Sequence, residues 1–148
     1  MNLEAQIQKD LITAMKAKDE KALRAVRAIK SAILIFKTSG TNAVLDEDAE
    51  IKMLQKMVKQ RKESLAIFEQ QNRPELAQTE REEIEIIEKY LPQQLGVDEI
   101  EAVIKTIIAD SGATGMKDMG KVMGAANKAF AGKAEGAVIS GIVKKLLA

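Results

Sequence analysis

The sequence has 148 residues, and its mixture of 46% hydrophobic and 30% charged residues is typical of a soluble globular protein, not of a disordered chain. It contains no cysteine and no histidine, which excludes disulfides, thiolate metal sites and the commonest general base and zinc ligand. Aromatic residues are only 3% and tryptophan is absent, so we do not expect a stacking platform for single-stranded nucleic acid.

The net charge of +1 conceals an uneven distribution along the chain. Residues 1–73 carry 14 basic and 10 acidic side chains, residues 74–110 carry 3 and 10, and residues 111–148 carry 6 and 2. The basic tail suits a polyanionic partner, although the whole chain is not basic enough to coat RNA. Because the sequence has neither a secretory signal pattern nor a long uncharged apolar run, we expect a cytoplasmic protein that does not bind membranes.

Two amphipathic helices are predicted before residue 40. The first begins after Asn2, which can cap it, and ends near Lys18, while Asp19 can cap the second. Their apolar stripes are Leu3, Ile7, Leu11 and Met15 in the first, and Leu23, Val26, Ile29, Ile33 and Phe36 in the second. The polar segment 38–42 breaks this pattern, and we expect a mobile loop there.

A long helical hairpin is predicted to follow. Asp46 opens a helix of roughly 25 residues, the turn Asn72-Arg73-Pro74 ends it, and a fourth helix runs from Glu75 to Leu91. The apolar stripe of the third helix is Ile51, Leu54, Val58, Leu65 and Phe68. Met53 and Met57 form a second stripe on this helix that a partner helix can cover. The four acids at 46, 47, 48 and 50 fit the positive end of the helix dipole better than a metal site. Glutamates 80, 82, 83 and 85 predict a solvated face.

The segment Tyr90-Leu91-Pro92 marks the boundary between two helical parts, which we place at 1–95 and 96–148. Pro92 disfavours helical geometry in the residue before it, and Asp98 with Glu101 is the pattern of a capping box. Three short helices follow, with the stripes Ile100, Val103, Ile104, Ile107 and Ile108, then Met119, Val122, Met123, Ala126 and Phe130, then Ile139, Ile142, Val143, Leu146 and Leu147. We therefore predict an all-α chain, with a long-helix N-terminal domain of four helices and a small C-terminal three-helix bundle.

No arrangement of catalytic residues is apparent. The serines are scattered and none lies in a strained nucleophile turn, and there is neither a phosphate-binding loop of the Walker type nor a dinucleotide fingerprint. We assign no catalytic residue, no metal ligand and no cofactor.

The glycines of the C-terminal part are the more informative feature. Gly120 and Gly124 each cost a helix on the order of 1 kcal/mol relative to alanine. They permit either close approach of another helix or close approach of a phosphate backbone to the main chain. The start of the last helix, near Glu135, also favours an anion unless that glutamate fills the position. The candidate polyanion-binding residues are Lys117, Lys121, Lys128, Gly132, Lys133 and Gly136.

Two further groups of cations lie on the long helices. They are Arg24, Arg27 and Lys30 on the second helix, and Lys59, Arg61 and Lys62 on the third. Both groups fit solvated helix faces, and both also fit a phosphate contact surface.

Several motifs resemble a known family. The segments Lys59–Ser64, Asn72–Leu76 and Tyr90–Leu95 resemble the YqeY-like branch of the GatB/YqeY family, as do Asp118–Met123 and Gly132–Ala134 in the tail. This resemblance covers essentially the whole chain. Over about the last fifty residues the chain also resembles the C-terminal tail of the B subunit of the glutamine-dependent tRNA amidotransferase.

The resemblance implies a tail that binds tRNA, because the related tail of the amidotransferase helps to hold tRNA while the chemistry occurs elsewhere. The kinase domain of the B subunit and the amidase signature of the A subunit have no counterpart here. We therefore expect a non-catalytic, tRNA-associated adaptor that does not bind DNA. One alternative is an accessory component of a carbon–nitrogen ligase that uses glutamine as amide donor, with amidotransferase subunits or the glutaminyl-tRNA synthesis machinery as partners. The other is a protein-interaction or dimerisation module.

Overall fold

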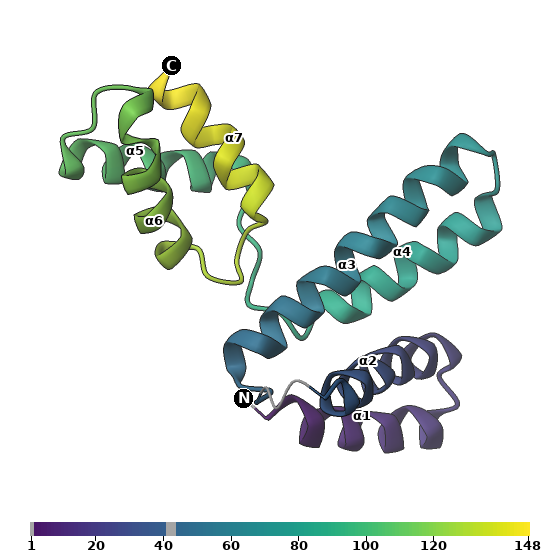
Figure 1. Ribbon diagram of the computed structural model, residues 1–148. Coiled ribbons are helices and arrows are strands. Elements are labelled where there is room, and N and C mark those ends of the chain that lie inside the picture. Colours follow the sequence, from purple (N-terminus) through teal and green to yellow (C-terminus); the bar gives the residue numbers. More distant parts are fainter. Residues whose placement is uncertain (1, 41–43) are drawn as a thin grey trace. The chain divides into compact units, whose positions relative to one another are not determined.

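Residues 2–40 and 44–148 are described by a computed structural model, and every regular element among them is a helix, as predicted for an all-α chain. Backbone contacts divide the chain into two compact units, one that ends at Leu91 and one that spans Pro92–Ala148 (Figure 1). Thr41 and Asn42, at the end of the segment predicted to be a mobile loop, lie outside the described residues.

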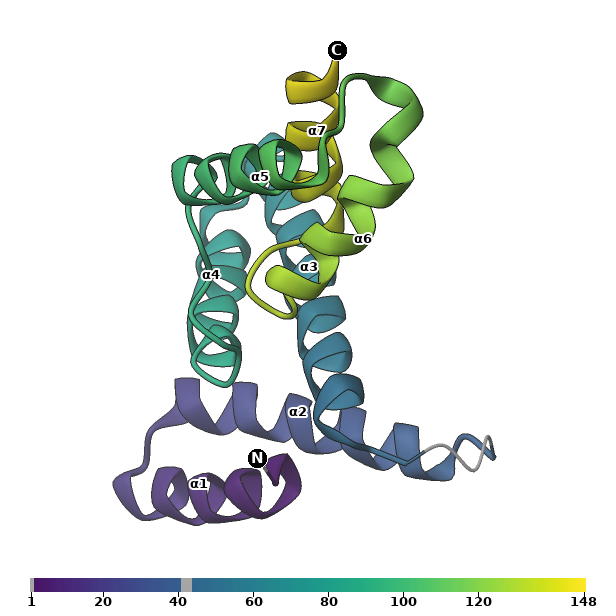
Figure 2. The ribbon, with the colours of Figure 1, turned by 90° about the vertical axis from the view of Figure 1, so that its left-hand side faces the viewer.

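The first unit consists of two helical hairpins. Helices α1 (Leu3–Ala17) and α2 (Glu20–Thr38) form one, and α3 (Glu47–Gln70) and α4 (Pro74–Glu88) form the longer other (Figures 1 and 2). Helix α2 packs against both α1 and α4 and so joins the hairpins. Helix α4 ends before the predicted Leu91, because the last amides before Pro92 bond to carbonyls three residues earlier and form tight turns.

The first three helices begin at the predicted side-chain caps. In each, a side-chain oxygen accepts the backbone N–H three residues further on, and the pairs are Asn2 with Ala5 at 3.2 Å, Asp19 with Ala22 at 3.1 Å, and Asp46 with Ala49 at 2.9 Å. Each bond satisfies an amide that has no partner inside its helix, so these starts are determined by local sequence.

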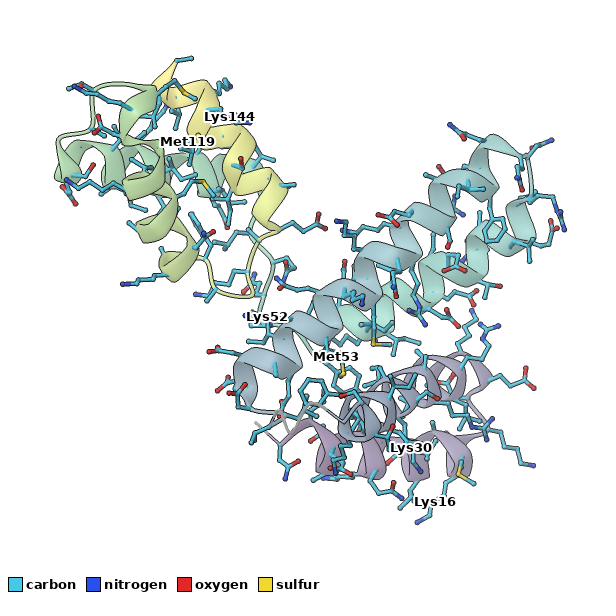
Figure 3. All side chains as sticks on the ribbon, viewed as in Figure 1. Lys16, Lys30, Lys52, Met53, Met119 and Lys144 are labelled. Atoms are coloured by element: carbon cyan, nitrogen blue, oxygen red, sulfur yellow. The ribbon has the colours of Figure 1, made fainter. Side chains whose placement is uncertain are left out.

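The core of the first unit lies where the two hairpins meet, and its buried members are Leu3, Ile7, Leu11, Val26, Ile29, Ile33, Leu54, Met57, Val58, Ile84, Ile87 and Leu91. Met57 is buried and Met53 packs against this core, pointing toward the α1–α2 hairpin (Figure 3), so the methionine stripe of α3 faces its own unit. Met15 is 55% exposed, contrary to prediction, and Ala14 is buried instead. Steps of four residues overshoot a full turn by about 40°, so the series starting at Leu3 rotates away from the core.

The acidic face of α4 is not simply solvated as predicted. Glu82 accepts from Arg24 at 2.9 Å and lies 3.4 Å from the ammonium of Lys21, both on α2, and its side chain is only 17% exposed. Burial acts to raise the pKa of the Glu82 carboxyl, but hydrogen bonds from Gln78 and Lys21 and the nearby cations together hold that pKa below its ordinary value. Glu82 therefore ties α4 to α2.

Arg61 plays the same part between α3 and α4. Its Nε donates to Glu83 at 3.0 Å, its Nη1 donates to the Met57 carbonyl at 3.3 Å, and both charged side chains are largely covered. Glu80 lies beside this pair, and burial, followed by repulsion from Glu83, raises the pKa of its carboxyl. Arg61 therefore belongs to the hairpin interface and not to a free basic surface.

Glu50 departs from the expected role of the acids at the start of α3. It is buried, and its Oε1 accepts the N–H of Leu3 at 3.4 Å, so the carboxylate lies at the start of α1 as well as α3. Its Oε2 has no hydrogen-bond partner among the residues that the structure describes. The other acids of this turn, Asp46, Glu47 and Asp48, fit the predicted interaction with the helix dipole.

The second unit contains α5 (Val97–Ser111), a short 3₁₀ turn η1 (Met116–Asp118), α6 (Met119–Ala129) and α7 (Gly136–Leu147). Its buried core is Ile100, Ile104, Val122, Ala126, Phe130, Ile139, Ile142, Val143 and Leu147. Gly112 ends α5 in the left-handed conformation, with φ of 71°, a position that glycine occupies without steric cost. Val103 of the predicted stripe is 39% exposed.

The predicted capping box of α5 is wrong. The helix begins at Val97, its cap residue is Gly96, and no side chain caps it, so Asp98 lies inside the first turn. The preceding residues are fixed by tertiary hydrogen bonds, in which Gln94 Nε2 donates to the Gly132 carbonyl at 2.7 Å and the Leu95 N–H donates to the Lys133 carbonyl at 2.9 Å. The segment before α5 therefore holds the loop between α6 and α7.

Replacement of Arg61 by leucine should lower the free energy of unfolding of the first unit by about 2 kcal/mol, because it leaves a largely covered carboxylate without its partner. The double variant Arg61→Leu/Glu83→Leu should recover most of this loss. Arg81→Leu is the matched control, since its ion pair with Glu69 is about half exposed and worth less than about 1 kcal/mol. Urea denaturation measures all three, and equal losses for Arg61→Leu and Arg81→Leu would contradict the prediction.

Acidification should weaken the link between α4 and α2. Because the folded pKa of Glu82 lies below its ordinary value of 4.5, its contribution to stability is complete above pH 4.5 and is lost as the pH falls through the folded value. Glu82→Gln should therefore flatten the fall of stability below pH 4.5, measured by denaturation at a series of pH values. In a Lys21→Gln/Arg24→Gln background the same replacement should have a smaller effect, and an undiminished effect would argue against these partners.

Candidate nucleic-acid interface

Helix α6 presents a narrow face with positive charge at both ends. Val122 and Ala126 point into the core, which turns Lys121 and Lys128 outward at a separation of seven residues, or about 10 Å along the axis. Gly124 and Ala125 lie between the two lysines on this exposed side. The face is therefore shallow, and no long side chain separates its two cations.

The glycines of α6 do not serve close packing of helices. Gly120 and Gly124 are exposed, and a Cβ built on either would meet no atom within 4 Å beyond the neighbouring backbone of its own helix. The interpretation that they admit another helix of the bundle is wrong. The open space leaves the backbone of α6 accessible from solvent, at a cost in helix propensity of about 1 kcal/mol per glycine.

Three of the candidate lysines lack a carboxylate partner. Lys117, Lys128 and Lys133 are exposed, and within the described part of the chain none lies at ion-pair distance from an acid. Lys121 differs, because its Nζ donates to the carbonyl of Ser111 at 3.2 Å. That carbonyl belongs to the last turn of α5 and has no partner inside the helix, so Lys121 also has a structural role as a C-terminal cap.

Asp118 is the carboxylate that accompanies these lysines in sequence. Its Oδ2 accepts the N–H of Thr114 at 3.0 Å, and this bond is the main cause that holds the pKa of Asp118 below its ordinary value. Burial opposes that shift, while Lys117 and Lys121 reinforce it. Asp118 therefore remains charged and offsets part of the positive potential at the start of α6.

The two glycines near the start of α7 have different roles. Gly132 is buried, has φ of 74° and offers its carbonyl to Gln94, so it shapes the loop from inside. Gly136 is exposed, is the first residue of α7, and has open space around its Cβ position. Glu135 is the cap residue of this helix and makes no side-chain capping bond, which contradicts the idea that it caps the helix.

Tyr90 and Leu91 belong to the first unit. Leu91 is buried in that core, and the Tyr90 hydroxyl donates to Asp10 of α1. Burial, followed by the hydrogen bond and the charge of Asp10, raises the pKa of Tyr90 well above its usual range. Tyr90 lines an open groove of about 830 Å³ between α1, α2 and α4, whose polar members include the already paired Asp10 and Glu82.

Two residues of this region were missed by sequence reasoning. Gln94 holds the loop before α7, and its position two residues after Pro92 is the local signal for such a role. Gly141 lies on the exposed side of α7, again with open space around its Cβ position. Its spacing of four residues from Ala137, which is also exposed, is a detectable signal for a second small-residue face.

Among the described residues, no group of three acidic side chains is arranged to hold a metal ion. In the same part of the chain, no helix combines the length and the apolar character needed to cross a bilayer.

Comparison with known proteins gives a match to the sequence model of the family described as Yqey-like protein, over residues 4–147. Similar curated proteins carry the name "Altered inheritance of mitochondria protein 41, mitochondrial". The one from Lachancea thermotolerans is 38% identical over 89 residues, which make up 60% of this chain and 48% of the relative. The one from Meyerozyma guilliermondii is 40% identical over 85 residues, 57% of this chain and 44% of the relative.

The relative from Pyrenophora tritici-repentis is aligned more completely, at 26% identity over 130 residues, which are 86% of this chain and 71% of the relative. The chain spans about half the length of the Lachancea and Meyerozyma relatives. The name of these relatives assigns them to mitochondria, whereas the sequence of this chain led us to expect a cytoplasmic protein. Because the family match extends over nearly the whole sequence, the chain belongs to the Yqey-like protein family.

Proposed function

We propose that the chain is a non-catalytic adaptor that binds tRNA through its second unit. The observation that carries this proposal is the outward face of α6, where exposed lysines flank glycines that have open space around them. A phosphate backbone can approach such a face closely, since neither a long side chain nor a carboxylate partner of Lys128 stands in the way.

The surroundings of α6 extend the basic surface within the second unit. Lys117 precedes the helix and Lys133 follows it, both exposed, and the uncapped start of α7 adds amide groups that favour an anion. The choice of tRNA among nucleic acids rests on the resemblance of this tail to that of the amidotransferase B subunit. The subunits of that enzyme are, on the same ground, the proposed protein partners.

Replacement of Lys117, Lys128 and Lys133 by glutamine should weaken tRNA binding. It should also reduce the slope of log K against log salt concentration by about two to three units, because a protein with fewer cations displaces fewer counterions from the RNA. Lys121 is left in place because it caps α5. The matched control is Lys9→Gln/Lys16→Gln/Lys18→Gln on α1 and its C-terminal cap, which removes the same charge from exposed positions outside both candidate surfaces. Filter binding at several salt concentrations measures the slopes. Absence of tRNA binding by the unaltered protein at low salt would remove the proposal.

The open face of α6 gives a second test. Gly124→Leu places a bulky side chain between Lys121 and Lys128, where space is available, so the helix should keep its stability or gain up to about 1 kcal/mol. The same variant should bind tRNA at least tenfold more weakly, because the backbone can no longer approach. Thermal unfolding and tRNA titration are measured in parallel, with Gly124→Ala as the smaller control. Unchanged affinity in the leucine variant would show that RNA does not contact this face.

A further inference from the structure

Helix α3 carries a row of lysines that the first unit does not use. Lys52, Lys56 and Lys59 recur at spacings of four and three residues, so they share one side of the helix over about 10 Å. All three are exposed, and in the described ranges none lies at ion-pair distance from a carboxylate. Figure 3 shows Lys52 pointing away from the α1–α2 hairpin, toward which Met53 points.

The row contrasts with the other cations of the hairpin that contains it. Arg61 and Arg81 are each paired with a glutamate across the α3–α4 contact, and Arg24 of α2 is paired with Glu82. Neighbouring lysines of like charge on one helix face repel each other by a few tenths of a kcal/mol per pair. Asp48 and Glu63, four residues before and after the row, offset part of that cost at its two ends, but no acid lies among the three lysines on this side, so the row itself is a surface for an anionic partner.

The chemistry around the row selects the class of partner. The apolar residues of α3 next to it, Leu54, Met57 and Val58, are buried in the core, so the helix offers no apolar side along the described residues of the row for insertion into a lipid surface. The row also has no aromatic side chain for stacking on bases. A line of positive charges without apolar or aromatic neighbours is complementary to the regularly spaced phosphates of a nucleic-acid backbone.

We propose that Lys52, Lys56 and Lys59 form a second RNA contact surface, located in the first unit, that binds the phosphate backbone without reading sequence. This inference rests on the proposed function, since it adds a surface for the same tRNA partner. Of the positions singled out from sequence, Arg24, Arg61 and Lys62 are engaged within the unit. Arg27 and Lys30 of α2 are exposed and have no ion pair among the described residues, but they are two cations and not a row of three. The row of Lys52, Lys56 and Lys59 is therefore the proposed contact surface of the long helices.

The test compares tRNA binding of three triple variants of the full chain. Lys52→Gln/Lys56→Gln/Lys59→Gln should bind at least tenfold more weakly at low salt, with a slope of binding against salt that is smaller by about two to three units. The Lys9→Gln/Lys16→Gln/Lys18→Gln control, with the same change of charge, should retain the slope of the unaltered protein. Circular dichroism should be unchanged, because all the replaced side chains are exposed.

The outcomes separate this inference from the proposed function. If the α3 variant binds like the unaltered protein while the Lys117, Lys128 and Lys133 variant loses affinity, the inference is wrong and the tail still binds RNA. If only the α3 variant loses affinity, the inference stands and the tail proposal fails. The last experiment measures binding to phosphatidylserine vesicles. If the unaltered protein binds them and the α3 variant alone does not, the row contacts a lipid surface and the inference is wrong.

Discussion

The ion pairs between α4 and its two neighbouring helices determine which positive charges of the first unit remain available. Glu82 holds cations of α2, and Glu83 holds Arg61 of α3, in positions where the carboxylates are largely covered. Each pair replaces hydration that burial removes, so it holds its two helices together only while both partners are present. The acidic side chains of α4 therefore serve contacts within the unit, and the lysines on the outer side of α3 are left unneutralised.

The second unit separates its charges in another way. Its apolar residues form a closed core of three helices, and glycine, alanine and lysine predominate on the exposed sides of α6 and α7, whereas the exposed side of α5 carries Asp98, Glu99 and Asp110. Only Lys121 is bound to the backbone of a neighbouring helix, and Gly132 is enclosed by the loop that it forms. The remaining candidates, Lys117, Lys128, Lys133 and Gly136, are all exposed. An anionic partner can approach them without displacing an internal ion pair.

Local patterns predicted the helices and three of their caps, because a cap such as Asp19 acts on an amide only three residues away. The failures have tertiary causes. Met15 left the core through the gradual rotation of a four-residue repeat, and the start of α5 depends on hydrogen bonds from Gln94 and Leu95 to a distant loop. The spacing of the lysines on α6 was visible in sequence, but the cap formed by Lys121 on α5 depends on how these helices pack.

The segment 92–95, which precedes α5 and donates hydrogen bonds to the loop before α7, determines where the tail can be cut without loosening that loop. A fragment that begins at residue 96 would lack both donors, Gln94 Nε2 and the Leu95 N–H, that hold the carbonyls of Gly132 and Lys133 at the turn into α7. A fragment that begins at Pro92 keeps them. Proteolytic trimming between these two positions would therefore loosen the far end of the tail while leaving its helices intact in sequence.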